Sequence, residues 1–271
     1  MAAPVPASPL TIREAANPAE CGEVSALFTS IWGGHQHIPP ELGRAIVESG
    51  GYVVAARRDG VVVGASVGVV GTSGGHVHLH SHITGVVPTE QRNGVGLALK
   101  RHQRTWARER GMDRIVWTFD PLVRRNAHFN LARLGARAMR YEVDFYGPVR
   151  DAINGADDTD RLVVEWATAG DEGPGPITST ATDALVATPA DIVALRAADP
   201  AAARRARVDV REAVGERMAQ GWVIAGVDAE GRYVLRPPSC GSCWAPTSRG
   251  SAPNTAASLK TKHDAARSAT T

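Results

Sequence analysis

Up to about Ala169, apolar residues recur with two different periods along the chain. One period is typical of short strands and the other of amphipathic helices. Asn17-Pro18 and Pro40-Glu41 indicate helix starts, because asparagine caps a helix and proline suits its first turn. The runs 52–56 and 61–70 flank the turn pair Asp59-Gly60, which predicts a β-hairpin. The pattern also predicts a turn at 71–75, helices at 94–110 and 124–134, and strands at 76–87, 115–119, 141–146 and 162–166.

The pattern changes twice further along the chain. After a linker at 170–176, a long helix is predicted from Asp199-Pro200 to Gly221. Its apolar residues recur every four positions, as in a buried stripe: Ala206, Val210, Val214 and Met218. A helix start at 188–191 and a hairpin of 222–227 with 232–235 complete this part. From Pro237 onward Ser, Thr, Ala, Pro and Lys follow without periodicity, which predicts disorder.

We therefore expect three parts: a domain of residues 1–169, a C-terminal extension of residues 170–236 packed on it, and a tail of residues 237–271. The succession of strands and helices predicts an α/β fold. The chain of 271 residues is 43% apolar, which is enough for a sizeable core.

Charge and composition exclude several classes of protein. The net charge of +2, from 30 basic and 28 acidic residues, gives no reason to expect a nucleic-acid partner. The first residues do not form a signal-peptide pattern, and no run of about 18 apolar residues could span a membrane. The three cysteines give no disulfide framework. We expect a cytoplasmic protein with no membrane partner.

The segment from Gln91 to Lys100 follows a predicted strand and opens a predicted helix. The first turn of a helix has backbone N–H groups without intrahelical partners and carries about half a positive charge. Phosphates bind such helix ends. Gly94 and Gly96 have no side chains, so a pyrophosphate can approach the backbone, and Arg92 and Lys100 add positive charge nearby. We therefore predict an anion site here.

Two other phosphate motifs are excluded. The dinucleotide fingerprint needs a third glycine, but Leu99 stands three residues after Gly96. The Walker loop needs Gly-Lys-Ser/Thr, which is absent. The alternative is a tight strand-to-helix turn whose glycines serve packing alone, since such turns are common in α/β folds.

The loop and its surroundings resemble the GNAT N-acyltransferase superfamily. Gln91, Gly94 and Gly96 fill that family's Gln/Arg-x-x-Gly-x-Gly/Ala motif, and Pro88 precedes them as in many relatives. The order of predicted elements also matches over residues 10 to 168. A narrower resemblance, to a poorly characterised subgroup with a C-terminal extension, rests on the stretches 79–82, 117–122, 125–131 and 134–136.

The resemblance implies a central mixed, mostly antiparallel sheet with a splayed strand pair, flanked by helices, plus a small α/β extension. It implies acetyl-CoA, or another acyl-CoA, as co-substrate, with an acceptor amine attacking the thioester directly. The pantetheine arm would bind the backbone of residues 85–87, and the pyrophosphate the N–H groups of residues 92–96. The cofactor-binding residues are then Gly85, Val86, Val87, Gln91, Arg92, Asn93, Gly94, Val95 and Gly96, with Asn130 as a further contact.

Direct transfer needs a neutral amine, and a base of near-neutral pKa such as histidine can provide it. By the period of two, one strand face would carry four imidazoles: His76, His78, His80 and His82. His82 is nearest the thioester position that the resemblance implies, so we assign it as a base or substrate ligand. A partly solvated strand face is the plainer alternative. A zinc site from the four imidazoles is a third, but zinc more often takes ligands from different elements, and we expect no metal.

Many relatives carry a general-acid tyrosine four residues before the glycine of a Leu-Gly pair. Leu131 occupies that position here, so the usual acid is missing. Asn126 and Asn130 could contact the cofactor or the carbonyl together with water, or could cap and bond within their helix. Asp120 could orient the substrate amine, or could cap the turn at Pro121.

Two further features have plain alternatives. The basic run of the long helix could form a solvated face or could meet a carboxylate of a substrate: Arg204, Arg205, Arg207 and Arg211. Cys240 and Cys243 form a lone Cys-x-x-Cys, which lacks the second pair of ligands that zinc needs.

The leading hypothesis is an enzyme that moves an acetyl group, or a larger acyl group such as succinyl, to the amine of a small molecule such as an amino acid. A non-catalytic acyl-CoA sensor or scaffold is the alternative, which the missing tyrosine keeps open. A protein acetyltransferase is a third hypothesis, for which no peptide groove is evident. A homodimer is compatible with the resemblance, because relatives often dimerise.

Overall fold

Seven strands form the main sheet within residues 8–33, 37–147, 157–170 and 173–238, the part of the chain that the computed structural model describes. Their order is β1-β2-β3-β4-β5-β7-β6, and every neighbouring pair is antiparallel except β4 and β5. The bounds are β1 Thr11–Glu14, β2 Tyr52–Arg58, β3 Val61–Ser73, β4 His76–Val86, β5 Arg114–Phe119, β6 Arg137–Glu142 and β7 Arg161–Ala167. The predicted mixed, mostly antiparallel sheet is confirmed.

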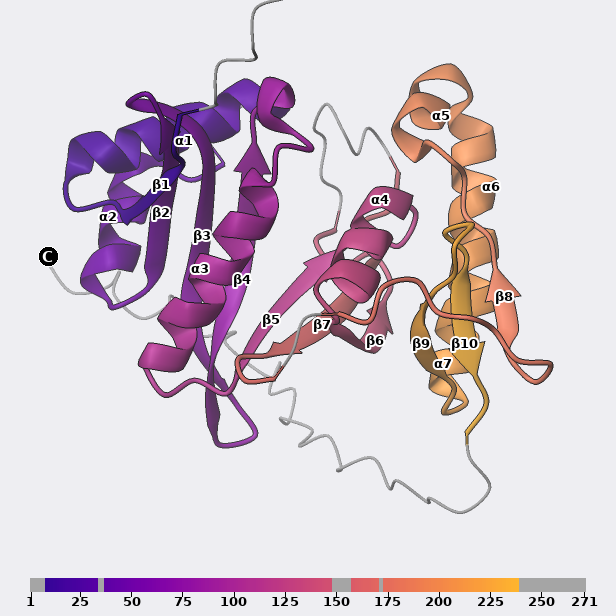
Figure 1. Ribbon diagram of the computed structural model, residues 1–271. Coiled ribbons are helices and arrows are strands. Elements are labelled where there is room, and N and C mark those ends of the chain that lie inside the picture. Colours follow the sequence, from indigo (N-terminus) through magenta and orange to yellow (C-terminus); the bar gives the residue numbers. More distant parts are fainter. Residues whose placement is uncertain (1–7, 34–36, 148–156, 171–172, 239–271) are drawn as a thin grey trace, which may run out of the picture. The chain divides into compact units, whose positions relative to one another are not determined.

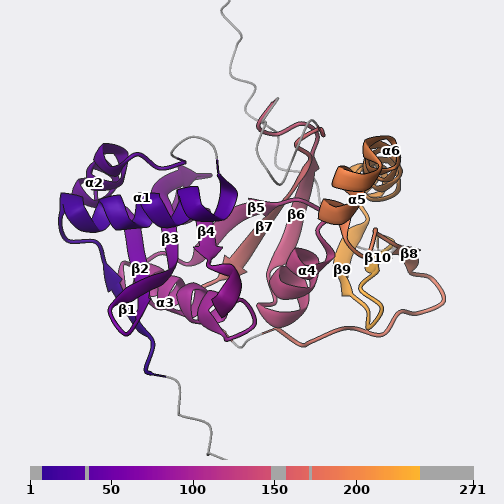
Figure 2. The ribbon, with the colours of Figure 1, turned by 90° about the horizontal axis from the view of Figure 1, so that it is seen from above.

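Helices cover both faces of this sheet (Figure 2). One face carries α1 (Pro18–Trp32) and α2 (Pro40–Glu48), and the other carries α3 (Val95–Glu109) and α4 (Arg124–Ala127). A 3₁₀ turn, η1 (Pro88–Glu90), precedes α3, and α4 continues into a π-helical turn, η2 (His128–Arg133). Alternate residues of each strand therefore face different cores. Val53 joins the cluster of Leu27 in α1, whereas Val54 joins the cluster of Leu99 in α3.

Short sequence motifs correctly predicted the positions of most of these helices and strands. Asn17 caps α1 as predicted, its side chain accepting a hydrogen bond of 3.0 Å from the backbone N–H of Glu20. The hairpin of β2 and β3 turns at Asp59 and Gly60, whose φ angles of 50° and 77° suit this residue pair.

Three predictions about strands were wrong. The sequence pattern missed β1, which is short and mostly exposed. Strand β3 runs on to Ser73, so the turn is confined to Gly74 and Gly75. The strand predicted at 141–146 is β6, which begins and ends earlier because Asp144 adopts a left-handed φ of 47° and turns the chain.

The C-terminal extension contains a three-stranded sheet in the order β8-β10-β9 within the described residues. Its strands are β8 Ala184–Val186, β9 Val223–Val227 and β10 Tyr233–Arg236. Its helices are α5 Ile192–Ala198 and α6 Pro200–Val210, which continues through the π-helical turn η3 Arg211–Glu216 into α7 Arg217–Ala219. Val210 and Val214 of the predicted stripe are buried, and they share one apolar cluster with the main sheet. The boundary between a domain and an extension stays a prediction, and residues 239–271, including Cys240 and Cys243, lie outside the described residues.

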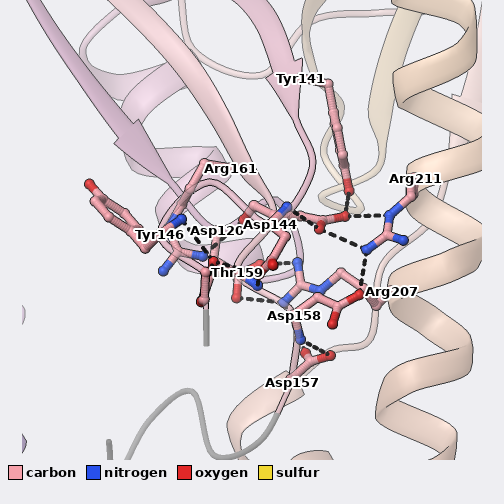
Figure 3. Close-up of polar contacts among 12 residues, drawn as sticks. Asp120, Tyr141, Asp144, Tyr146, Asp157, Asp158, Thr159, Arg161, Arg207 and Arg211 are labelled. Carbon is pink, nitrogen blue, oxygen red and sulfur yellow. Dashed lines mark hydrogen bonds and ion pairs between the residues drawn. The ribbon is translucent and has the colours of Figure 1, made fainter. Parts of the chain in front are cut away.

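A buried ion cluster connects β5 to α6 (Figure 3). The two terminal nitrogens of Arg207 donate to the two carboxylate oxygens of Asp120 over 2.7 and 2.9 Å. Arg196 donates to the same carboxylate over 2.7 Å, and both arginines also bind Asp157. Because Arg207 is only 1% exposed, these carboxylates are needed to offset the energetic cost of burying its charge.

A second group of ion pairs joins the cluster through η3. Arg211 donates to Asp160 over 2.8 Å and to Asp158 over 2.7 Å. The basic run predicted as one surface is therefore divided: Arg204 and Arg205 are exposed, whereas Arg207 and Arg211 turn toward carboxylates.

We predict that Asp120→Ala lowers the free energy of unfolding by about 3–5 kcal/mol, because two buried guanidinium groups lose a shared carboxylate. Adding Arg207→Met should restore part of the loss, since one unpaired charge is then gone. Arg204→Met, at an exposed position of α6, is the matched control. Urea unfolding measures all three, and a loss for Asp120→Ala no larger than for the control would contradict the prediction.

Candidate functional site

The two parallel strands of the sheet separate soon after they meet (Figure 1). Strands β4 and β5 pair only at Leu79 with Ile115 and at His80 with Val116. Beyond these residues the strands diverge, so the backbone edge of β4 from Ser81 onward has no partner in β5. Unpaired strand backbone offers hydrogen-bond donors and acceptors to a ligand.

A β-bulge lies where the two strands separate. Val67 of β3 faces Ile83, and the next residue, Gly68, faces Ser81, so His82 is the extra residue. The strict alternation predicted for the four histidines is therefore broken at His82.

The four imidazoles differ in exposure. His76 and His82 are exposed, His80 is half-buried and His78 is buried. The rings of His80 and His82 are still only 6.4 Å apart, centroid to centroid. Partial desolvation by the surrounding protein lowers the pKa of His80 and also that of His82, although His82 keeps an exposed surface. The charges of neighbouring His82, His78 and Lys100 lower the pKa of His80 further. Both rings are therefore neutral near pH 7, as an acceptor of protons requires.

The side chain of Lys100 does not lie at the glycine loop, so the expectation that it adds positive charge there for a phosphate is wrong. Its side chain is 5% exposed and turns from α3 into the sheet. Its Nζ donates to Ser81 Oγ over 2.9 Å and to Gln103 Oε1 over 3.1 Å, and lies 3.9 Å from the centroid of the Trp117 ring. Burial lowers the pKa of Lys100 to about 7. Lys100 and Gln103 are three residues apart on the buried face of α3. This spacing is the sequence signal that could have indicated that the Lys100 side chain points into the protein.

The glycine loop opens α3 as predicted. Gly94 is the residue before the helix and has a left-handed φ of 80°, which favours glycine. Arg92 also has a left-handed φ, of 76°. Within the described residues no side chain caps α3, and the N–H groups of Val95 and Gly96 have no acceptor. Donors without partners at a helix start are what a pyrophosphate would bind.

Side chains of the loop itself hold it in place. Gln91 Nε2 donates to the carbonyl oxygen of Val86 over 3.3 Å, and Asn93 Nδ2 donates to Glu90 over 3.2 Å. Glu90 is in turn paired with Arg58 over 3.1 Å. The Gln91 side chain thus ties the loop to the end of β4, where the strand stands away from β5.

Gly85 and Gly96 differ in whether packing within the protein requires a glycine. A Cβ at Gly85 would lie 2.8 Å from side-chain atoms of Ile31 and Trp32, so the end of α1 requires glycine there. At Gly96 the nearest atom would belong to Val86 at 3.9 Å, which is ordinary contact. Packing alone therefore does not demand glycine at position 96, and space remains for a ligand.

The residues expected on the following helix lie close to the same region. Asn130 is 5% exposed and its Oδ1 accepts a hydrogen bond of 3.2 Å from the indole of Trp117. Asn126 is half-buried, and Leu131, which replaces the expected tyrosine, is buried. A π-helical turn spans His128–Arg133, a feature frequent at functional sites. A cofactor role for Asn130 and a catalytic role for Asn126 stay predictions.

Asp120 caps the turn at Pro121, which is the second of the two roles expected for it. Its Oδ1 accepts a hydrogen bond of 2.9 Å from the backbone N–H of Leu122, and both oxygens bind Arg207. Despite its burial, the pKa of Asp120 is lowered to about 2, because hydrogen bonds and charges of Arg207 and Arg196 outweigh desolvation. The carboxylate is therefore ionised, and its role toward a substrate amine stays a prediction.

Three polar residues that the sequence pattern did not single out face the same side as His80. Thr118 is two residues beyond Val116 on β5, and its Oγ1 lies 3.1 Å from the hydroxyl of Tyr146. The guanidinium of half-buried Arg161 lies 5.3 Å from the Tyr146 ring and forms no ion pair within the described residues, donating only to the carbonyl of Asp160 (Figure 3). Only the fold brings these residues together, so no local motif could have indicated them.

Within the part of the chain that the structure describes, no group of three or more His, Cys, Asp or Glu side chains could hold a metal ion. No described helix has both the length and the apolar character needed to cross a membrane.

Comparison with known proteins supports one family. Residues 23–136 match the sequence model of the acetyltransferase (GNAT) family. No curated protein matches the chain. Similar solved structures include a GNAT-family acetyltransferase from Streptococcus pneumoniae, with 16% identity, a TM-score of 0.47, and 59% of this chain and 99% of that chain covered.

Two further solved structures are similar over the same share of the chain. An aminoglycoside 6'-N-acetyltransferase complexed with coenzyme A has 14% identity and a TM-score of 0.45, with 59% of this chain and 98% of that chain covered. An aminoglycoside 6'-acetyltransferase type Ii has 17% identity and a TM-score of 0.45, with 59% of this chain and 99% of that chain covered.

The matched region spans strands β2 to β5, the glycine loop and the helix that follows β5. Over residues 23–136 the chain has the sequence features of the GNAT acetyltransferase family. It is an acyltransferase that uses acetyl-CoA as co-substrate, as members of this family do.

We predict that Gly96→Asp separates cofactor binding from folding. Stability should stay the same or rise by up to about 1 kcal/mol, because aspartate is favourable at a helix start and glycine is a poor helix former. The affinity for acetyl-CoA should fall by about 100-fold, because the new carboxylate would face the phosphates.

Ala19→Asp is the matched control for that variant, since it adds the same charge to the exposed first turn of α1. Titration calorimetry with acetyl-CoA measures both. Equal affinities of the two variants would mean that the pyrophosphate does not bind at the start of α3.

Lys100 predicts a pH dependence of stability. Its pKa is about 7 in the folded protein and about 10.4 in an unfolded chain, so the unfolded state binds more protons between these values. The free energy of unfolding should therefore rise between about pH 7 and about pH 10. Urea unfolding across this range should show a steeper rise for the wild type than for Lys100→Met. Parallel curves for the two proteins would contradict the prediction.

Proposed function

We propose that the chain transfers an acetyl group from acetyl-CoA directly to the amine of a small molecule that also carries a carboxylate, such as an amino acid. The observation that carries this is the glycine loop, which starts α3 immediately after the strand that separates from its parallel neighbour. An acyl donor bound with its phosphates on the loop would lie along the free edge of β4 and end beside the bulge at His82. A larger donor such as succinyl-CoA is an alternative.

Each cofactor residue has a proposed contact in this arrangement. The backbone of Gly85, Val86 and Val87 would bind the pantetheine arm, and the N–H groups of residues 92–96 the pyrophosphate, with Gln91 holding the loop. Asn126 and Asn130 would contact the thioester end of the cofactor from the helical turn after β5.

His82 would take the proton of the acceptor amine. Its lowered pKa keeps the imidazole neutral near pH 7, and its place in the bulge sets it at the opening between the strands. The acceptor nitrogen then attacks the thioester carbonyl carbon, and the C–S bond breaks with its electron pair on sulfur. The proton that His82 took from the amine returns through water to the coenzyme A thiolate, which leaves as the thiol.

Arg161 supports an acceptor with a carboxylate. A half-buried guanidinium without an ion pair in the described residues can bind a carboxylate through two parallel hydrogen bonds. Burial lowers the pKa of Arg161, yet arginine stays charged at neutral pH. The hydroxyls of Thr118 and Tyr146 stand beside it on the face of His80.

The acceptor is tested by thiol release from acetyl-CoA with the twenty amino acids and with their amides. An acid should react better than its amide by about tenfold to 100-fold, which is the value of one charge-assisted hydrogen bond. Arg161→Gln should remove this preference by raising the KM for the acid. Arg140→Gln, exposed on β6, is the control.

The outcomes separate the alternatives. Equal rates with acids and amides would contradict the carboxylate, and no heat of binding with acetyl-CoA, succinyl-CoA or coenzyme A would contradict the function as a whole. Tight binding without turnover on any amine would favour the acyl-CoA sensor. A homodimer, a cytoplasmic location and the division at residues 169 and 236 stay predictions.

A further inference from the structure

The amine of Lys100 lies beneath the point where β4 and β5 separate. The last pair of the two strands is His80 with Val116, and the next residues along them are Ser81 and Trp117. Lys100 Nζ contacts both of these, at 2.9 Å from Ser81 Oγ and 3.9 Å from the centre of the Trp117 ring. One buried side chain from α3 therefore joins the two strands at the first position where their backbones no longer do.

A chain of hydrogen bonds extends this contact past the bulge. Lys100 donates to Gln103 over 3.1 Å, Gln103 Nε2 donates to Ser66 Oγ over 3.3 Å, and Ser66 Oγ lies 2.8 Å from Thr84 Oγ1. Ser81 and Thr84 are thus held from below on either side of the bulge. The backbone of the bulge has few ways to move without breaking one of these bonds.

Packing alone does not explain a lysine here. Within the described residues no carboxylate pairs with Lys100, and its neighbours are hydroxyls, an amide and an indole. His80 of β4 couples to Lys100 through its charge, and Gln103 of α3 and Trp117 of β5 contact Lys100 without charge. A buried amine without an acid is costly, whereas a methionine would fill the same space.

We propose that Lys100 is a positioning residue of the acyl-transfer site, which fixes the bulge of β4 and places a positive charge beneath the thioester. This rests on the proposed function, since the acyl group has to lie beside the bulge. During transfer, negative charge develops on the thioester oxygen as the C–N bond forms and the C–S bond breaks. A fixed cation below this atom lowers the barrier, and Lys100 itself exchanges no proton.

The test measures acyl transfer without the natural acceptor. Hydroxylamine serves as the nucleophile, thiol release from acetyl-CoA gives kcat, and calorimetry gives the Kd of acetyl-CoA. In Lys100→Met, kcat should fall by about tenfold or more while Kd changes by less than about threefold. Arg108→Met, which removes an exposed charge from α3, is the matched control and should change neither value.

The pH profile distinguishes positioning from simple packing. The ratio of the wild-type kcat to that of Lys100→Met should be largest below about pH 7 and should fall as the amine loses its proton. Ser81→Ala keeps the amine but removes its anchor on β4, and should lower kcat with Kd unchanged, which covers the case that Lys100→Met does not fold.

Equal kcat values for wild type and Lys100→Met, or a ratio that does not change with pH, would overturn the role of Lys100 while leaving acyl transfer intact. A wild type that binds no acetyl-CoA and releases no thiol would overturn both proposals. Normal kcat in Ser81→Ala would show that the bulge needs no support from below, and would also overturn the positioning role.

Discussion

The separation of β4 from β5 is the constraint on which the site depends. Two parallel strands that paired over their full length would leave no backbone edge for a ligand, and the glycine loop after β4 would open onto a closed sheet. The bulge at His82 interrupts the register, and Lys100 occupies the space beneath the opening with an amine bound to Ser81 and resting on Trp117. The space below the opening is therefore filled by the buried Lys100 side chain and its hydrogen bonds to Ser81 and Gln103.

A second set of buried charges stabilises the far end of β5. Asp120 directly follows that strand and binds Arg196 and Arg207 from the extension, so the position of the strand end is set by residues far away in the sequence. Breaking such a cluster costs more than its formation contributes, because each remaining charge stays buried. The extension is therefore coupled to the wall of the site opposite β4, next to Arg161 and Tyr146.

Local signals predicted much of the fold and one half of the site. Asn17, Asp59-Gly60 and the loop from Gln91 to Gly96 each act within a few residues, so their consequences can be inferred from sequence. The inward turn of Lys100, the bulge at His82 and the ion pairs of Arg207 depend on packing between distant segments. From charge alone, Lys100 was expected near the phosphate, and Arg207 on a solvated face or at a substrate carboxylate. A sequence does not show which charged groups find buried partners within the protein.

We expect acetyl-CoA to bind with its phosphates at the start of α3 and its acyl group in the opening beside His82. A crystal structure of the protein with acetyl-CoA should show pyrophosphate oxygens on the N–H groups of Val95 and Gly96, and the thioester between the bulge and β5. A cofactor bound elsewhere, or one whose thioester lies on the α3 face of the sheet, would contradict this expectation.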